Sequence, residues 1–421
     1  MHRFRQHILL VATLGVACVG PPASATTTPA RQSLAAELLQ DAADGKLDQH
    51  SLLVAALIAE GIADRNQLDQ LHQQFDHHRR QLIDQVATID NPSQLAPAVF
   101  DYLHQRILQG EYRSDCSWLS ESLGNGHYNC LSATILYQCL CRELNVPVQG
   151  MERPEHVFCR LTGERRRDVE ATCPSWFSEN RELAAAGTVE DARDETIAAN
   201  PISELQLIAR MYYNRGIDYV DRQQFAAAVS SIEVGLQIDP THAASQRNLR
   251  ATLNNWALAC AQQQQFERAA GLLARLMDLD PEFEPLLVND LHIHQQWVLH
   301  LCEQREYAQA LDVLCNGYER RPTAQLFDRG RFALYEEWAA HNLEENNPAA
   351  AAEVFALARH RHGPCRDVLD AEAATFGHHA LLRQQQGHPA QARQLLATAL
   401  SRQPDNRFLH GIQGQLGEQP N

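Results

Sequence analysis

The chain has 421 residues, of which 44% are hydrophobic and 21% are charged. These values are ordinary for a globular protein and exclude wholesale disorder, and the length suffices for two or three domains that each have a core. The formal net charge of −16 disfavours phosphate backbones and anionic lipids as partners, so we expect no nucleic-acid partner.

The N-terminus has the pattern of a secretory signal peptide. Arg3 and Arg5 precede an apolar run from Ile8 to Gly20, and Ala23-Ser24-Ala25 forms a small-x-small cleavage site. The apolar run is too short for a transmembrane span, and we expect none. We therefore predict a signal peptide over residues 1–25 and a periplasmic or extracellular location.

Cysteine usage depends on this export prediction. Cleavage after Ala25 removes Cys18 and leaves ten of the eleven cysteines, whereas retention of Cys18 as a lipid-anchored residue is the alternative, a lipoprotein. An oxidising compartment permits disulfides, but these cysteines are scattered along a long chain. We expect several of them to remain reduced in the core, and their pairing stays open.

The segment after the polar N-terminal stub has helical spacing of apolar residues. Two such faces are Leu52, Leu53, Ala56 and Leu57, and then Leu68, Leu71, Phe75 and Leu82. No residue pattern in this segment indicates chemistry. We predict a helical layer that packs against the part of the chain that follows.

A helix and a β-hairpin are predicted in the central stretch. Asn129 is a plausible N-cap for a helix that begins at Cys130 and ends before Pro147. Three strands are expected after it: 146–151, 156–161 and 167–172. A helix followed by antiparallel strands indicates an α+β domain.

Cys130 is the candidate nucleophile of this domain. The free N–H groups and the dipole at a helix start favour the thiolate form of a cysteine. Cys130 could instead be a buried packing residue, as most nearby cysteines are expected to be. An oxyanion site would use the Cys130 backbone N–H, with a second donor from His127, Tyr128 or Asn129.

The hairpin supplies candidates for the other two members of a catalytic triad. If residues 162–164 form a three-residue loop, Leu161 pairs with Arg165 and His156 lies opposite Glu170 on one face. Glu170 would then orient the imidazole, and His156 would take the thiol proton. Asp168 shares this face as a diagonal neighbour and is the alternative third member. By the same parity, Cys159 and Cys173 face away.

The motifs Asn129-Cys130-Leu131-Ser132, Pro154-Glu155-His156-Val157 and Asp168-Val169-Glu170-Ala171-Thr172 resemble the transglutaminase-like superfamily of papain-type cysteine proteins. The resemblance is greatest to a bacterial branch with helices before this core and tetratricopeptide (TPR) repeats after it. It covers about Leu34 to Phe177 and implies acyl transfer through a thioester, with Cys130 as nucleophile and His156 as base. Glu170-Ala171-Thr172 departs from the aspartate, proline and threonine that are usual there, which leaves Asp168 as an alternative.

A repeat occupies the remainder of the chain. Proline recurs at intervals of 41, 41, 42 and 40 residues, at Pro240, Pro281, Pro322, Pro364 and Pro404. An aromatic residue lies 15 positions before three of them, and alanine lies 12 before all five. The pattern resembles the TPR repeat, although its period exceeds the usual 34 residues, so we expect longer helices or turns. We predict about five helix pairs over residues 196–416, after a transglutaminase-like domain over 32–180.

The leading hypothesis is an exported transglutaminase-like cysteine hydrolase or acyltransferase with a Cys130, His156 and Glu170 (or Asp168) triad, whose repeats bind a protein or peptide. The alternatives are a non-catalytic interaction scaffold with a degenerate core and a membrane-anchored regulatory scaffold. We expect no cofactor and no metal, because the histidine pairs lack the spacing of metal ligands. No phosphate-binding glycine motif occurs either.

Overall fold

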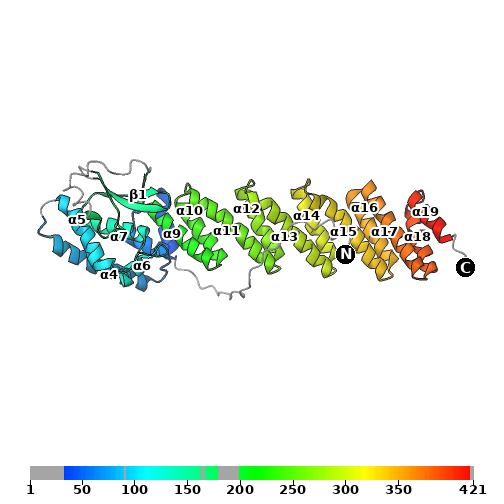
Figure 1. The fold of residues 1–421 in the computed structure, drawn as a ribbon, viewed down its shortest axis with the longest axis horizontal. Coiled ribbons are helices and arrows are strands. Elements are labelled where there is room, and N and C mark those ends of the chain that lie inside the picture. Colours follow the sequence, from blue (N-terminus) through cyan, green and yellow to red (C-terminus); the bar gives the residue numbers. More distant parts are fainter. Residues whose placement is uncertain (1–32, 90–91, 163–165, 179–198, 418–421) are drawn as a thin grey trace. The chain divides into compact units, whose positions relative to one another are not determined.

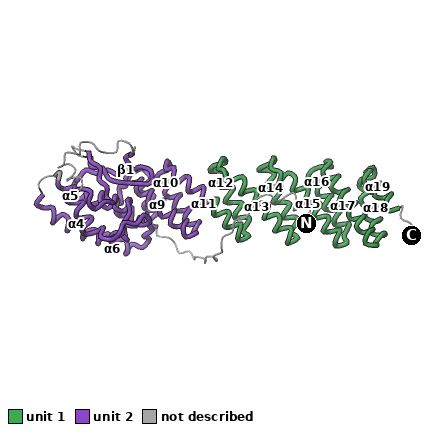
Figure 2. Tube along the Cα trace, in the orientation of Figure 1, with its two compact units in different colours: residues 1–20, 254–421 green, residues 21–253 purple. Residues whose placement is uncertain are grey.

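The structure is a computed structural model that describes residues 33–89, 92–162, 166–178 and 199–417. The predicted signal peptide and Cys18 lie outside these residues. Across the described part of the chain, no helix is both long and apolar enough to cross a membrane. The described residues divide into two compact units, with the boundary between Leu253 and Asn254 (Figure 2).

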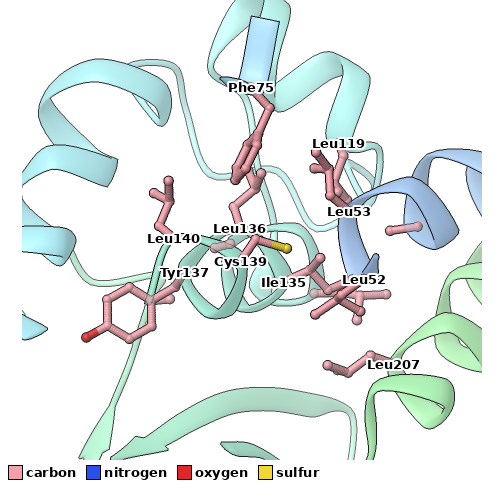
Figure 3. Close-up of a cluster of buried hydrophobic side chains, with 14 of the residues drawn as sticks. Leu52, Leu53, Phe75, Leu119, Ile135, Leu136, Tyr137, Cys139, Leu140 and Leu207 are labelled. Carbon is pink, nitrogen blue, oxygen red and sulfur yellow. The ribbon is translucent and has the colours of Figure 1, made fainter. Parts of the chain in front are cut away.

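Unit 2, the first part of the chain, is built around one buried helix, α7 (Cys130–Glu143), in which every residue from Leu131 to Cys141 is buried. Figure 3 shows α7 side chains meeting Leu52 and Leu53, Phe75 and Leu119, which come from three other helices. The helices and turns around α7 are α2 (Leu34–Asp41), η1 (Ala42–Asp44), α3 (Leu52–Glu60), α4 (Arg65–Val86), α5 (Pro92–Tyr102), the π-helix η2 (Leu103–Ile107) and α6 (Leu119–Asn125).

A four-stranded antiparallel sheet with the order β3-β2-β1-β4 packs beside α7 (Figure 1). Its strands are β1 (Val148–Arg153), β2 (His156–Leu161), β3 (Arg167–Val169) and β4 (Asn200–Ile202). The predicted combination of a helix-rich fold with a small antiparallel sheet is therefore confirmed. β2 has the predicted bounds, whereas β4 was not predicted.

The register between β2 and β3 differs from the predicted one. Leu161 pairs with Arg167 instead of Arg165, because the loop between the strands is longer than three residues. A shift of two residues preserves side-chain parity, so residues predicted to share a face still share it. β3 also ends at Val169, earlier than predicted, which leaves Glu170 just past the strand end.

The first helix pair, α9 (Glu204–Asp221) and α10 (Phe225–Ile238), belongs to unit 2. Arg210 of α9 donates to Glu152 of β1 at 2.6 and 2.8 Å and to Asp239 at the end of α10 at 2.7 Å. This buried guanidinium joins the sheet to the helix pair. The division between the two units falls after Leu253, inside the predicted repeat domain. The domain limits 32–180 and 196–416 remain predictions.

Four more helix pairs and a terminal helix follow in the described residues. They are α11 (Ala243–Gln262) with α12 (Phe266–Leu279), α13 (Glu284–Glu303) with α14 (Tyr307–Arg320), α15 (Gln325–Glu344) with α16 (Pro348–His362), α17 (Arg366–Gln385) with α18 (Pro389–Arg402), and α19 (Arg407–Gly417). The first helix of each of these pairs has 20 residues and the second has 14 or 15. The predicted proline-terminated array of helix pairs is confirmed, with long first helices.

The turn inside each pair has the same backbone conformation. The second of its three residues is left-handed, at Gln223, Gln264, Arg305, Asn346 and Gly387, which are spaced by 41 residues. The third residue donates its N–H five residues back, as Gln265 does to the Cys260 carbonyl at 2.9 Å. Glycine is the usual residue at the left-handed position of such a helix ending, yet four of these five left-handed positions have a residue other than glycine.

Gln264→Gly should therefore stabilise the protein. A non-glycine residue in the left-handed region costs about 1–2 kcal/mol, and glycine adds roughly 0.5–1 kcal/mol of unfolded-state entropy, so the net gain should be about 0.5–1 kcal/mol. Chemical denaturation measures the change. Gly387→Ala is the matched control and should destabilise; a loss of stability in Gln264→Gly would contradict the assignment of strain to this turn.

Candidate active site

The helix start at Cys130 is fixed by its N-cap, Asn129. The Asn129 side chain accepts from the backbone N–H of Leu131 at 2.9 Å and of Ser132 at 3.1 Å, and the Ser132 hydroxyl accepts from the Asn129 N–H at 3.0 Å. This reciprocal capping box determines that Cys130 is the first helical residue. Asn129 is only 3% exposed, so the cap is held inside the core.

The side-chain amide of Asn129 is also engaged. It donates to the Ser114 carbonyl at 3.2 Å and to the Ser117 hydroxyl at 2.8 Å, and Ser117 in turn accepts from Asn214 of α9 at 2.8 Å. All donors of Asn129 thus have acceptors within the protein. Its predicted role as an oxyanion donor remains a prediction that would require one of these bonds to break; the contacts present assign it to positioning.

The Cys130 backbone N–H is different. Within the described residues, the capping bonds go to the N–H groups of Leu131 and Ser132, and the Asn129 carbonyl accepts from Ala133 at 3.0 Å. The same residues provide no acceptor for the Cys130 N–H. It is therefore available to bind an oxygen of a ligand at the helix start.

His156 links the thiol to a carboxylate. It opens β2, and its Nε2 lies 2.6 Å from Oε2 of Glu170, while the Cys130 side chain lies close enough to the ring to affect its protonation. Because Glu170 engages Nε2, Nδ1 is the nitrogen that remains for Cys130. Cys130, and after it the hydrogen bond to Glu170, raises the pKa of His156 from 6.5 to about 9.

Glu170 is itself held in place by Thr172. Its Oε1 accepts from the Thr172 hydroxyl at 2.6 Å and from the Thr172 N–H at 3.3 Å. Burial would raise the pKa of Glu170, but the hydrogen bonds from His156 and Thr172 outweigh burial and lower it. A charged Glu170 therefore stabilises a protonated His156.

Asp168, the alternative third member of the triad, bonds to Arg160 and not to His156. Both of its oxygens accept from Arg160, with 3.0 Å between Nη2 and Oδ2, and its carbonyl accepts from Trp176 at 3.0 Å. Its carboxylate is therefore committed to a guanidinium on β2. Of the two carboxylates left open by the sequence, Glu170 is the one at the imidazole.

The other nearby cysteines lack this environment. Cys159 is fully buried, its thiol donates to the Thr134 carbonyl at 3.6 Å, and burial raises its pKa well above the usual value. Burial also raises the pKa of Cys139 and of Cys141 to about 12. All ten cysteines in the described residues are free thiols. These same residues contain no cluster of three or more His, Cys, Asp or Glu that could hold a metal.

The sequence did not indicate Ser117 or Tyr112 as neighbours of this site. Tyr112 forms an isolated parallel bridge with Tyr128, and Ser117 bonds to Asn129. Both contacts join irregular segments that have no periodic pattern. The one available signal was the glycines at 110 and 126, which permit a close backbone approach.

The array carries a separate pocket within unit 1. It has a volume of about 260 Å³ and is lined by α12, α13 and α14, at Glu267, Ala270, Gly271, Ala274, His294, Trp297, Val313, Asn316 and Arg320. Buried His294 accepts from the Arg320 guanidinium at 2.9 Å, and its other ring nitrogen donates to the Asp290 carbonyl at 2.8 Å. The pocket thus combines apolar walls with an oriented cation.

No model of a known protein family matches the chain, and no curated protein matches it. Solved structures that are similar include menin, at 12% identity over 93% of this chain and 96% of that one, with a TM-score of 0.38. A TPR repeats protein from Bacteroides fragilis is 13% identical over 50% of this chain and 97% of its own, with a TM-score of 0.28. The TPR protein YrrB is 13% identical over 49% and 92%, with a TM-score of 0.16. Identities of 12–13% and TM-scores of 0.16–0.38 support no functional conclusion about this chain.

Cys130 should be the cysteine that iodoacetamide alkylates fastest at pH 6. The neighbouring His156 imidazole can accept the Cys130 proton as the sulfur is alkylated, an aid that the buried cysteines lack, and the gain should be roughly tenfold. Peptide mapping by mass spectrometry gives the rate at each cysteine. His156→Ala should remove the advantage and Cys173→Ser should not; equal rates at Cys130 and Cys315 would rule out an activated thiol.

Proposed function

We propose that the protein is an exported transglutaminase-like cysteine enzyme that transfers an acyl group from an amide or peptide bond. The observation that carries this proposal is the placement of Cys130 beside His156, whose imidazole bonds to Glu170, which in turn accepts from Thr172. A helix-start cysteine, an imidazole and an orienting carboxylate are the parts of a papain-type site. The fold alone would not support this conclusion.

In the first half-reaction, the Cys130 thiolate attacks the carbonyl carbon of the substrate. The C–S bond forms, the oxygen takes the negative charge, and the Cys130 N–H donates to it. When the tetrahedral intermediate collapses, the C–N bond breaks and protonated His156 gives its proton to the leaving amine. A pKa of about 9 keeps His156 protonated at neutral pH for this step.

In the second half-reaction, an acceptor resolves the thioester. Neutral His156 takes a proton from water or from an amine as that molecule attacks the carbonyl carbon, and the C–S bond breaks to restore the thiolate. Water gives hydrolysis and an amine gives transfer. The His156 and Glu170 side chains remain 21% and 19% exposed, which favours access of water and a peptidase or amidase outcome.

The alternative function is a non-catalytic scaffold in which the TPR-like array binds a protein and the papain-like core is degenerate. The pocket on α12, α13 and α14 favours a docking role for the array. Arg320 is held by His294 and can receive a carboxylate, while Trp297 and Val313 can pack against an apolar side chain. Docking is compatible with catalysis, so the two functions are tested separately.

Hydrolysis of a peptide library should depend on the triad and on pH. Cys130→Ala should abolish turnover, and Glu170→Gln should lower kcat by roughly 10²- to 10⁴-fold. Turnover should fall as the pH rises above about 9, where His156 loses the proton that it gives to the leaving amine. In Glu170→Gln this decline should begin at lower pH, because Cys130 still raises the pKa of His156 but the charge of Glu170 no longer does.

Asp168→Asn is the matched control for this experiment. It removes the neighbouring carboxylate, which bonds to Arg160 and not to His156, so the pH profile should be unchanged. A profile that shifts in Asp168→Asn but not in Glu170→Gln would reverse the assignment of the third member. Turnover that survives Cys130→Ala would reject the catalytic proposal.

Peptides that end in a free carboxylate after an apolar residue should bind the full-length protein through the array pocket. Arg320→Ala and Trp297→Ala should each weaken binding by about tenfold or more, as expected for residues that anchor an interface. Panning of a displayed peptide library followed by calorimetry provides the measurement. Arg366→Ala, on the exposed start of α17, should leave the affinity unchanged, as should Cys130→Ala. Equal affinities in all variants would exclude this pocket.

A further inference from the structure

Two glycines bring a second segment against the loop that leads to Cys130. The Gly110 N–H donates to the Gly126 carbonyl at 3.0 Å, and a Cβ placed on either glycine would lie 2.7–2.8 Å from the backbone of the other. Atoms this close would overlap, so both positions require glycine. The contact sets residues 110–113 beside residues 126–128.

Further bonds hold the two segments in register. The Arg113 N–H donates to the Tyr128 carbonyl at 2.8 Å, and the Tyr128 N–H points to the Glu111 carbonyl at 3.4 Å. Tyr112 pairs with Tyr128 in a parallel bridge, with ring centroids 6.1 Å apart and nearly perpendicular planes. Tyr128 lies two residues before Cys130. Tyr112 is therefore fixed next to the start of the nucleophile helix.

The Tyr112 side chain is exposed, as are residues 111 and 113–115 around it. It is 51% exposed, whereas Tyr128 is 3% exposed, and no hydrogen-bond partner for its hydroxyl occurs in the described residues. Partial burial raises its pKa, and so do the negative charges of Cys130 and Glu170. The hydroxyl thus stays protonated, keeps its donor free and lies within electrostatic reach of the site.

An oxyanion that forms on the substrate needs more than the Cys130 N–H. The donors of Asn129 are all occupied, and the Tyr128 N–H is directed at Glu111. We propose that the Tyr112 hydroxyl is the second oxyanion donor and hence a further catalytic residue. The inference rests on the acyl-transfer function proposed above. It assigns to Tyr112 a bond that is formed only when the carbonyl oxygen becomes negative.

p-Nitrophenyl acetate tests this role, because its acylation of Cys130 passes through an oxyanion whereas alkylation by iodoacetamide does not. During acylation the C–S bond forms, the C–O bond breaks and p-nitrophenolate leaves, so the absorbance burst of full-length protein gives the rate. Tyr112→Phe removes only the hydroxyl. We expect its acylation rate to fall by roughly 10²-fold and its alkylation rate to stay within twofold of the unaltered protein.

Tyr219→Phe, which removes a hydroxyl bonded to Arg215 of α9, is the matched control and should change neither rate. Acylation that is unchanged in Tyr112→Phe would overturn the inference and leave the proposed function standing. Equal losses in acylation and alkylation would overturn it too, because the hydroxyl would then act on the thiolate. If the unaltered protein acylates no faster than Cys130→Ala, the proposed function fails and the inference with it.

Discussion

The architecture of unit 2 depends on the burial of α7. A helix whose residues 131–141 are all buried can be stable only if other elements cover every side, and here helices cover some faces and the sheet covers another. Water alone cannot reach the unpaired backbone N–H groups of its first turn, so the side chains of Asn129 and Ser132 accept these hydrogen bonds. Cys130, the residue at the start of this helix, therefore has little freedom, as its proposed role of nucleophile requires.

The sheet supplies the other half of the site through the same packing. β2 packs against the first turns of α7, where the Thr134 hydroxyl donates to the Val157 carbonyl, and this contact brings His156 near Cys130. Glu170 follows the end of β3 and is fixed by Thr172, not by the ladder of β-sheet bonds. The site therefore tolerates the short β3, because its carboxylate has a separate anchor.

The sequence predicted those parts of the fold that local rules determine. The cap at Asn129, the bounds of β2 and the proline-terminated pairs follow from side-chain chemistry and periodicity, and the structure has all three. The predicted β2–β3 register differs from the observed one by two residues, because the sequence only weakly determines the length of the loop between the strands. Side-chain parity is nevertheless the predicted one, because a shift of two residues keeps His156 and Glu170 on the same face. β4 and the approach of Gly110 to Gly126 are non-local. No sequence pattern marks β4, and the two glycines permit a close approach without identifying each other as partners.

The uniform turns of the array have a consequence for how its length can change. Left-handed residues recur every 41 positions from Gln223 to Gly387, so every pair in this range enters its second helix through the same backbone geometry. Removing or duplicating a segment of that length, cut at two equivalent turns, would join ends that already match. The repeats are therefore structurally equivalent at their turns. Homologous recombination within the gene could add or remove whole repeats, and the new connection would have the same turn conformation as the existing ones.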